Sequence, residues 1–445
     1  MVSESLSLRL ARWLCRIEPR SIPTPQRALA NMRVMDTVGL LLASSASPQA
    51  GIMRARAHAG SARGGASLVG GGKVEPEWAA LAHGVIAHCL DFDDTFPQSV
   101  VHPGSVIVPV VLALGEELAA PADDIVAALV GGYEVAARLA GAGGTRFHGR
   151  GFHASGIFAP IIAAYVAGRL MRLAPESMAS AVGLAASMSG GLMAFTADGA
   201  WSKWLHLGWG GFGGILATKL ARDGFRGPIG ALDGRYNLYE AFIGDPPEDV
   251  DARLGIDWEG ESALFKYYPC AHVIQPYIDL ALGLRREHAI SAGDVRTVRC
   301  RVAPWAVPIV CEPADRKIAP GSPVEAIASL NYNLALALCD GAVGLEALEE
   351  RNWTRTDVLS LSRNVAYTAD ASLTGFAAAL EIELRDGREV TAEGDAAAAD
   401  PTRLAAKFRA LAARALDAPG IAALERAVAD LDIKAIGTLL AGASR

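Results

Sequence analysis

The spacing of hydrophobic and polar residues changes character along the chain. Over roughly the first 245 residues, apolar positions recur every three or four residues, which is typical of amphipathic α-helices. This spacing predicts helices over 26–46, 77–90, 125–140, 155–172 and 209–222. The first half of the chain is therefore expected to be entirely helical, with loops at its glycine-rich breaks.

A period of two appears in the second half of the chain. Between 293 and 303, valines and a cysteine alternate with arginines, which is typical of a half-exposed strand. Residues 380–390 alternate in the same way around Asp386-Gly387, a dipeptide that favours a hairpin turn. Helical spacing between these segments, over 324–338, makes this region α+β.

Helical spacing returns near the end of the chain, over 402–416. A chain of 445 residues is also too long for one ordinary core, so more than one domain is expected. We therefore predict a mainly α fold with a large helical domain over 1–265, completed by C-terminal helices over 399–445. A smaller α+β lid domain over 266–398 is expected to be inserted between them.

Charge and cysteine content exclude several classes of function. The net charge of −7 is spread along the chain, and no basic patch with interleaved aromatics indicates a nucleic-acid partner. The six cysteines lack CxxC spacing, which argues against an iron–sulfur cluster and favours free thiols in a reducing compartment. The first twenty residues have the pattern of an amphipathic helix rather than a secretory signal. A cytoplasmic location is therefore expected.

One uncharged segment is long enough to be considered as a membrane span, over 177–197. It is rich in Ser, Gly and Ala, it holds only two leucines, and charged residues flank it on both sides. We interpret it as a buried central helix pair, and no membrane partner is expected.

The most polar loop of the helical region is AHCLDFDDTFPQSVVHPGS, over 87–105. Buried carboxylates and imidazoles are costly without partners, and loops on rigid scaffolds often carry chemistry. Asp91, Thr95 and His102 are therefore candidate functional residues. Asp93 and Asp94 are expected only to cap and solvate the turn.

Three further segments bring cations and imidazoles. His153 lies at a glycine-rich entrance to an apolar helix, where free N–H groups suit a carboxylate ligand. Lys203 lies between two tryptophans, and His206 follows three residues later on a neighbouring helical position. Lys266 and His272 lie at the expected domain junction, where ligand sites are favoured. Each histidine could instead cap or pack, and Lys266 could be a surface cation.

Cations combined with a few carboxylates would bind a small di- or tricarboxylate and move protons on it. Asp91, Asp93, Asp94 and His102 could also bind a metal ion, but no known metal motif has their spacing, so no metal is expected. No Walker A loop or dinucleotide fingerprint is present either, and no cofactor is expected. The glycines of 208–214 are interpreted as close helix packing.

Several of these motifs occur together in a specific order. The segments HGVIAHCLDFDDT…VHPGS, GYEVAARL…RGFHASG, SKWLHLGWGG…GFRGP, YYPCAH and ASLNYNLALALCDG span most of the chain. In this combination the chain resembles the MmgE/PrpD family, which includes 2-methylcitrate dehydratase, cis-aconitate decarboxylase and iminodisuccinate epimerase. The resemblance implies a helical domain with an α+β lid, a homodimer, and a site between the domains.

The resemblance also implies a set of site residues, which together would bind carboxylates and exchange protons. In chain order they are Asp91, Thr95, His102, His153, Lys203, Lys266, His272 and Tyr332. We expect the lysines and His102 to hold carboxylates and stabilise enolate-like charge. His153 and His272 would act as acid and base, Asp91 would orient a histidine, and Thr95, Tyr332 and His206 would contact substrate.

The expected activity is that of a lyase that dehydrates or decarboxylates a small polycarboxylate without a cofactor. Epimerisation of a dicarboxylate such as iminodisuccinate shares the same half-reaction and is the alternative. A non-catalytic polycarboxylate-binding protein on the same scaffold is the alternative from another class. The loop between Asp91 and His102 is slightly longer than in decarboxylase-like members, and Ala154-Ser155 follows His153 where Pro-Thr is common. These departures affect the choice of substrate.

Overall fold

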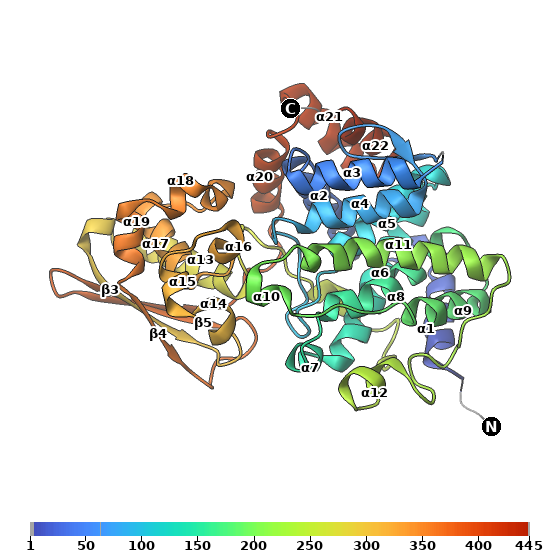
Figure 1. Ribbon diagram of the computed structural model, residues 1–445, viewed down its shortest axis with the longest axis horizontal. Helices are drawn as coiled ribbons and strands as arrows, with labels where there is room; N and C mark the ends of the chain where they lie inside the picture. Colours follow the sequence, from blue (N-terminus) through green and yellow to red (C-terminus); the bar gives the residue numbers. More distant parts are fainter. Residues whose placement is uncertain (1–3, 63, 444–445) are drawn as a thin grey trace. The chain divides into compact units, whose positions relative to one another are not determined.

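The chain divides into two compact units along its sequence. The computed structural model describes residues 4–62 and 64–443. The helical unit comprises the residues up to Ala263 and those from Pro401 onward, and the α+β unit comprises Leu264–Asp400 (Figure 1). Most of the secondary structure is helical, so the predicted mainly α class is confirmed.

The helical unit packs its helices around α4, α8 and α11, with α11 lying between the other two. Its helices are α1 (Leu6–Arg16), α2 (Thr24–Ala43), α3 (Pro48–Gly60), α4 (Pro76–His88), α5 (Gly104–Glu117), α6 (Ala122–Gly143), α7 (Arg146–Gly149), α8 (Ala154–Leu170), α9 (Pro175–Ala186), α10 (Phe195–Asp198), α11 (Ser202–Arg222), α12 (Leu238–Ile243), α20 (Pro401–Ala412), α21 (Ala418–Ala429) and α22 (Ile433–Ala441). Short strands β1 (Ala66–Ser67) and β2 (Lys73–Val74) form an antiparallel pair.

The helix expected from residue 209 begins earlier, at Ser202, and this places Lys203 and His206 in its first two turns.

Glycines allow α11 to approach α8 closely. A Cβ atom on Gly210 would lie 2.2 Å from the Cβ of Ala159, and one on Gly214 would lie 2.3 Å from the Cβ of Ala163. Real side chains do not approach to such distances, so only glycine permits this helix spacing. The interpretation of the glycine-rich stretch as close helix packing is confirmed.

Replacing Gly210 with alanine should lower the free energy of unfolding by about 1–3 kcal/mol, because an extra methyl group must displace the α8 backbone. Gly51, in α3, has no atom within 4 Å of the corresponding Cβ position. Gly51→Ala should therefore stabilise the protein, by about 0.5–1 kcal/mol, through helix propensity. Chemical denaturation of the two variants checks this, and equal stability would contradict the packing explanation.

Two segments of the helical unit have the composition of a membrane span. Helix α6 is long and apolar enough to cross a membrane by length and composition, yet 89% of its apolar window is buried inside the structure, which is typical of a core helix.

The segment over 177–197 does not form the expected helix pair. Helix α9 ends at Ala186, an irregular stretch follows, and α10 is a single turn. Its glycines and serines, which lack the side chains to pack a second helix, account for this break.

The α+β unit is built on a four-stranded sheet with strand order β4-β3-β5-β6. Its elements are β3 (Val295–Val302), β4 (Val365–Ala369), β5 (Ala378–Leu384), β6 (Glu389–Gly394), α13 (Gln275–Glu287), α14 (Val307–Val310), α15 (Ala314–Ile318), α16 (Pro323–Ile327), α17 (Leu330–Asp340), α18 (Glu350–Trp353) and α19 (Thr356–Ser362). Strand β3 is parallel to β4 and antiparallel to β5, and β5 and β6 form a hairpin. The expected strand and hairpin are confirmed, with Gly387 at φ +90° in the turn.

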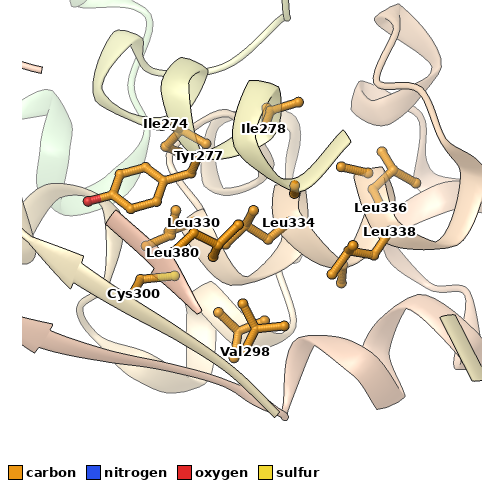
Figure 2. Close-up of a cluster of buried hydrophobic side chains, with 14 of the residues drawn as sticks. Ile274, Tyr277, Ile278, Val298, Cys300, Leu330, Leu334, Leu336, Leu338 and Leu380 are labelled. Atoms are coloured by element: carbon orange, nitrogen blue, oxygen red, sulfur yellow. The ribbon is translucent and has the colours of Figure 1, made fainter. Parts of the chain in front are cut away.

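The core of the α+β unit lies between the sheet and helices α13 and α17 (Figure 2). The helix expected over 324–338 is broken into α16 and α17, because the Ser329 side chain accepts a hydrogen bond from the Tyr332 N–H and begins a new helix. The side chains labelled in Figure 2 come from α13 with its preceding turn, α17 and the two central strands: Ile274, Tyr277, Ile278, Leu330, Leu334, Leu336, Leu338, Val298, Cys300 and Leu380.

Candidate active site

The loop between α4 and α5 brings most of the candidate residues together. Helix α4 ends at His88, and Asp91 then adopts a left-handed backbone conformation with φ +48°. Aspartate tolerates this conformation better than most residues, and such strain is often found at functional sites. The turn lets the chain fold back, so that the loop side chains from Asp93 to Thr95 are buried.

An ion pair joins this loop to α11. The Lys203 Nζ donates a hydrogen bond to Asp91 Oδ2 over 2.6 Å, and the other Asp91 oxygen lies 3.9 Å from His102 Nε2. The Lys203 side chain is 19% exposed and that of Asp91 is 13% exposed. An ammonium has three N–H donors, so Lys203 can bind a second anion while it remains paired with Asp91. Two of the predicted residues are thus in direct contact.

The His102 ring is held by its own loop. Its Nδ1 lies 3.1 Å from the carbonyl oxygen of Asp94 and 3.2 Å from the hydroxyl of Thr95. A carbonyl only accepts, so Nδ1 carries the proton in this arrangement and Nε2 keeps the lone pair of the neutral ring. The His102 backbone N–H donates to the Ser155 hydroxyl over 3.2 Å. Thr95 is fully buried and contacts His102, so its observed role is to orient the imidazole.

A buried pair of His88 and Asp93 was not anticipated from the sequence. The His88 Nδ1 lies 2.9 and 3.0 Å from the two Asp93 oxygens, and the Ser105 hydroxyl donates to Asp93 over 2.6 Å. The expectation that Asp93 only caps and solvates the turn is wrong, because its side chain is 1% exposed. His88 lies one helical turn before Asp91, within an apolar run whose pattern gives no sign of function. Its position at the end of that run, next to the polar loop, was the available signal.

Asp94 is also buried, and the expectation of a solvated role is wrong for it too. It accepts hydrogen bonds from the Tyr133 hydroxyl over 2.6 Å and from the Gly104 N–H over 2.8 Å. Burial raises the pKa of Asp94 to about 7, and the hydrogen bond from Tyr133 opposes this rise. The Arg33 guanidinium lies 3.6 Å from the centre of the Tyr133 ring. Asp94 therefore anchors the loop to α5 and α6.

His153 and His206 form a second imidazole pair. Their Nδ1 atoms lie 3.0 Å apart, with His153 preceding the first residue of α8 and His206 in the second turn of α11. Burial lowers the pKa of His153 well below its usual value, and the charges of Lys203 and His88 act in the same direction. Burial also lowers the pKa of His206 to about 4. Both rings are therefore neutral at pH 7, so that one Nδ1 can donate and the other accept.

The C-terminal helices also support the loop. Lys407, in α20, donates to the carbonyl oxygen of Phe92 over 2.8 Å, and its Nζ lies 3.8 Å from the centre of the Phe92 ring. The same Nζ lies 2.6 Å from Asp36 in α2, and both charged side chains are buried. Lys407 therefore fixes the backbone between Asp91 and Asp93, a role that its sequence context did not indicate.

The remaining three predicted residues belong to the α+β unit. Lys266 and His272 are both buried, and the His272 ring stacks on Phe376 with centroids 4.5 Å apart. Tyr332 lies fully buried in the core of this unit, and its hydroxyl donates to the Ala347 carbonyl over 2.7 Å. This placement gives Tyr332 a packing role, so we do not assign it to substrate.

Two family models match the chain, and together they cover most of it. The MmgE/PrpD N-terminal domain matches residues 8–250, and the MmgE/PrpD C-terminal domain matches residues 268–432. The chain belongs to the MmgE/PrpD family. The N-terminal match contains the loop, His153 and Lys203, and the C-terminal match contains Lys266 and His272.

Curated relatives match over most of their length at low identity. The cis-aconitate decarboxylase-like protein oryM of Aspergillus oryzae is 24% identical, over 98% of this chain and 97% of that protein. A cis-aconitate decarboxylase of Aspergillus terreus is 24% identical, over 96% of this chain and 93% of its own. The cis-aconitate decarboxylase of Homo sapiens is 26% identical, over 84% of this chain and 81% of its own. These relatives agree with a lyase family.

Proposed function

We propose that this protein is a lyase that decarboxylates a small, unsaturated di- or tricarboxylate such as cis-aconitate. The observation that carries the proposal is the Lys203–Asp91 ion pair beside the neutral His153–His206 pair. A cation for a carboxylate and an imidazole for a proton are the two elements that this chemistry needs. The names of the curated relatives support the choice of decarboxylation over dehydration.

Lys203 is the proposed binding group for a substrate carboxylate. Asp91 accepts one of its N–H donors and aims the ammonium, which leaves the other donors for the substrate. Little rearrangement is needed when negative charge develops next to it, because the ion pair fixes the ammonium before substrate binds. Lys203 lies in the first turn of α11, and His206, the partner of His153, lies in the second turn of the same helix.

His153 is the proposed proton donor, with His206 as its source. One substrate carboxylate leaves as CO₂, and the electron pair of the broken C–C bond stays on carbon, delocalised into the neighbouring carboxylate. Lys203 stabilises this charge. His153 then transfers its Nε2 proton to the carbon and takes the Nδ1 proton of His206 across their 3.0 Å contact. Solvent restores the proton on the half-buried His206, so each turnover consumes one proton.

The remaining groups position these residues. Thr95, Ser155 and the Asp94 carbonyl hold His102 with its Nε2 toward Asp91, where it can contact a second carboxylate in its protonated form. Lys266 and His272 are further proposed contacts for the substrate, on the basis of residue type and the family resemblance.

Proton NMR in D₂O tests the proposed reaction. The purified chain is incubated in turn with cis-aconitate, 2-methylcitrate and iminodisuccinate, and His153→Asn serves as the inactive control. Loss of CO₂ with one deuterium bound to carbon in the product supports the proposal. Loss of water would replace it with dehydration, and deuterium exchange without net product would replace it with epimerisation. No change in any of the three compounds contradicts an enzymatic function of this class and favours a binding protein.

A further inference from the structure

Three buried imidazoles converge in the helical unit. His88, His102 and His153 each offer a ring nitrogen, and these nitrogens all lie within 4.8 Å of one another. The ring centroids are 4.8 Å apart for His88 and His102, and 6.3 and 6.5 Å from each of these to His153. We infer that His88, His102 and His153 form a binding site for one borderline divalent metal ion such as Zn²⁺.

The outer contacts of the three rings are those expected of metal-binding histidines. Such histidines usually donate their second N–H to a carboxylate, a carbonyl or another acceptor, which fixes the tautomer and the ring orientation. Here the Nδ1 of His88 is bonded to Asp93, that of His102 to the Asp94 carbonyl, and that of His153 to His206. For His88 this leaves Nε2 as the nitrogen that can bind a metal ion.

His88 Nε2 provides an independent indication of a ligand. This atom is buried, and no hydrogen-bond partner for it exists among the residues that the structure describes. Burying a polar atom without a hydrogen-bond partner is unfavourable, because the atom loses its bonds to water and gains none in return. A metal ion that takes this lone pair removes the penalty. The proposed catalytic steps do not use His88, so its position is otherwise unexplained.

The types of donor atom in and beside the site indicate which class of cation would bind. Asp91 and Asp93 offer carboxylate oxygens in a second group with His88 and His102, again with all ligand atoms within 4.8 Å. Three imidazole nitrogens select Zn²⁺, Co²⁺ or Ni²⁺ over the oxygen-seeking Mg²⁺ and Ca²⁺. With Zn–N bonds of about 2.0–2.1 Å, ligating nitrogens lie roughly 3.3 Å apart, which is compatible with three nitrogens that all lie within 4.8 Å of one another.

Metal binding at this position would inhibit the proposed reaction, because it occupies His153, the proposed proton donor, and His102. This consequence rests on the proposed function, whereas the binding itself does not. The site would thus make the activity sensitive to free zinc.

Titration of the full-length, EDTA-treated protein with Co²⁺ tests the site. One bound ion per chain is expected, with the visible ligand-field absorption of nitrogen-coordinated Co²⁺, and Zn²⁺ should displace it. His88→Gln should abolish this absorption. Asp93→Asn should weaken binding by about 10–100-fold, the usual loss when an outer partner of a ligand is removed. His58→Gln, which removes an exposed imidazole, should bind as the unmodified protein does.

The outcomes separate the metal site from the proposed function. Absence of one-to-one binding, or binding unchanged by His88→Gln, overturns the metal site whatever the activity. Co²⁺ binding without turnover of any tested carboxylate leaves the metal site standing and contradicts the proposed function. Circular dichroism of His88→Gln ensures that lost binding does not reflect lost folding. Where turnover is found, inhibition by Zn²⁺ that EDTA reverses is the expected result, and undiminished turnover with the ion bound would contradict inhibition.

Discussion

Replacing Lys203 with methionine should lower kcat/KM toward cis-aconitate by about 100–1000-fold, the usual loss when one preorganised donor to developing charge is removed. Methionine keeps an unbranched apolar stem of similar length and removes only the ammonium. The carboxylate of Asp91 then loses its partner at 2.6 Å, and the substrate loses its cation. Steady-state kinetics of the purified variant check this result.

Lys219 provides a matched control for this change. It lies on the same helix, α11, and its Nζ also lies 2.6 Å from a carboxylate, that of Glu77. The two ion pairs are similarly buried, with carboxylate side chains that are each 13% exposed. Lys219→Met should therefore lose a comparable ion pair while kcat/KM stays within about twofold of the unmodified protein. Equal losses in the two variants would show that Lys203 acts only through stability.

Replacing His153 with asparagine should lower kcat by about 100–10,000-fold, the range for loss of a general acid or base. Asparagine retains a hydrogen-bonding group for His206 but cannot pass a proton between two ring nitrogens. Because the proposed transfer occurs only in the chemical step, KM should change much less than kcat. Rapid-quench or steady-state measurement of both constants distinguishes this from weakened binding.

His83 is the control for His153. It is buried in α4, burial lowers its pKa to about 4, and its Nε2 accepts a hydrogen bond from the Val69 N–H. His83→Gln preserves an acceptor for that N–H and should leave kcat unchanged. NMR of ¹⁵N-labelled histidine adds a second check, since His153 and His206 should remain neutral from pH 8 down to pH 5. Protonation of His153 near pH 6.5 would contradict the relay.

The parts of the fold that follow from local spacing could be predicted. Helical periodicity located the main helices, and the Asp386-Gly387 turn located the β5–β6 hairpin. The break at Ser329 could not be predicted, because it depends on a single cap within a continuous apolar pattern. The failure over 177–197 has a related cause: an uncharged composition indicates burial but does not specify whether small residues form a helix.

Residues of the candidate site could be predicted from the sequence only where a polar residue was unexpected among its apolar neighbours. Asp91, His102 and Lys203 stood out in this way, and the structure brings all three together. His88 did not, since a histidine at the end of an apolar helix resembles a packing residue, and only its position next to the polar loop distinguished it. The prediction for Asp93 was wrong because its partner could not be known from the sequence. Burying a carboxylate is unfavourable unless a partner such as His88 replaces its lost hydration.

Contacts distant in sequence were beyond prediction from local patterns. The hydrogen bond from Lys407 to the Phe92 carbonyl joins residues 315 positions apart. Propensity and periodicity act over a few turns of helix, so they carry no information on such a pairing. The local sequence around Lys407 therefore carries no signal of this contact.

The position of Lys407 late in the chain determines when, during translation, the loop between α4 and α5 gains its support from α20. The α+β unit is synthesised between the loop and the helix that holds the loop, because α20 begins only at Pro401. A nascent chain that ends before residue 401 lacks the Lys407 ammonium that pairs with Asp36 and donates to the Phe92 carbonyl. The loop that carries Asp91 is therefore completed only when the last helices leave the ribosome, and a premature stop codon anywhere before Lys407 removes this support from the site.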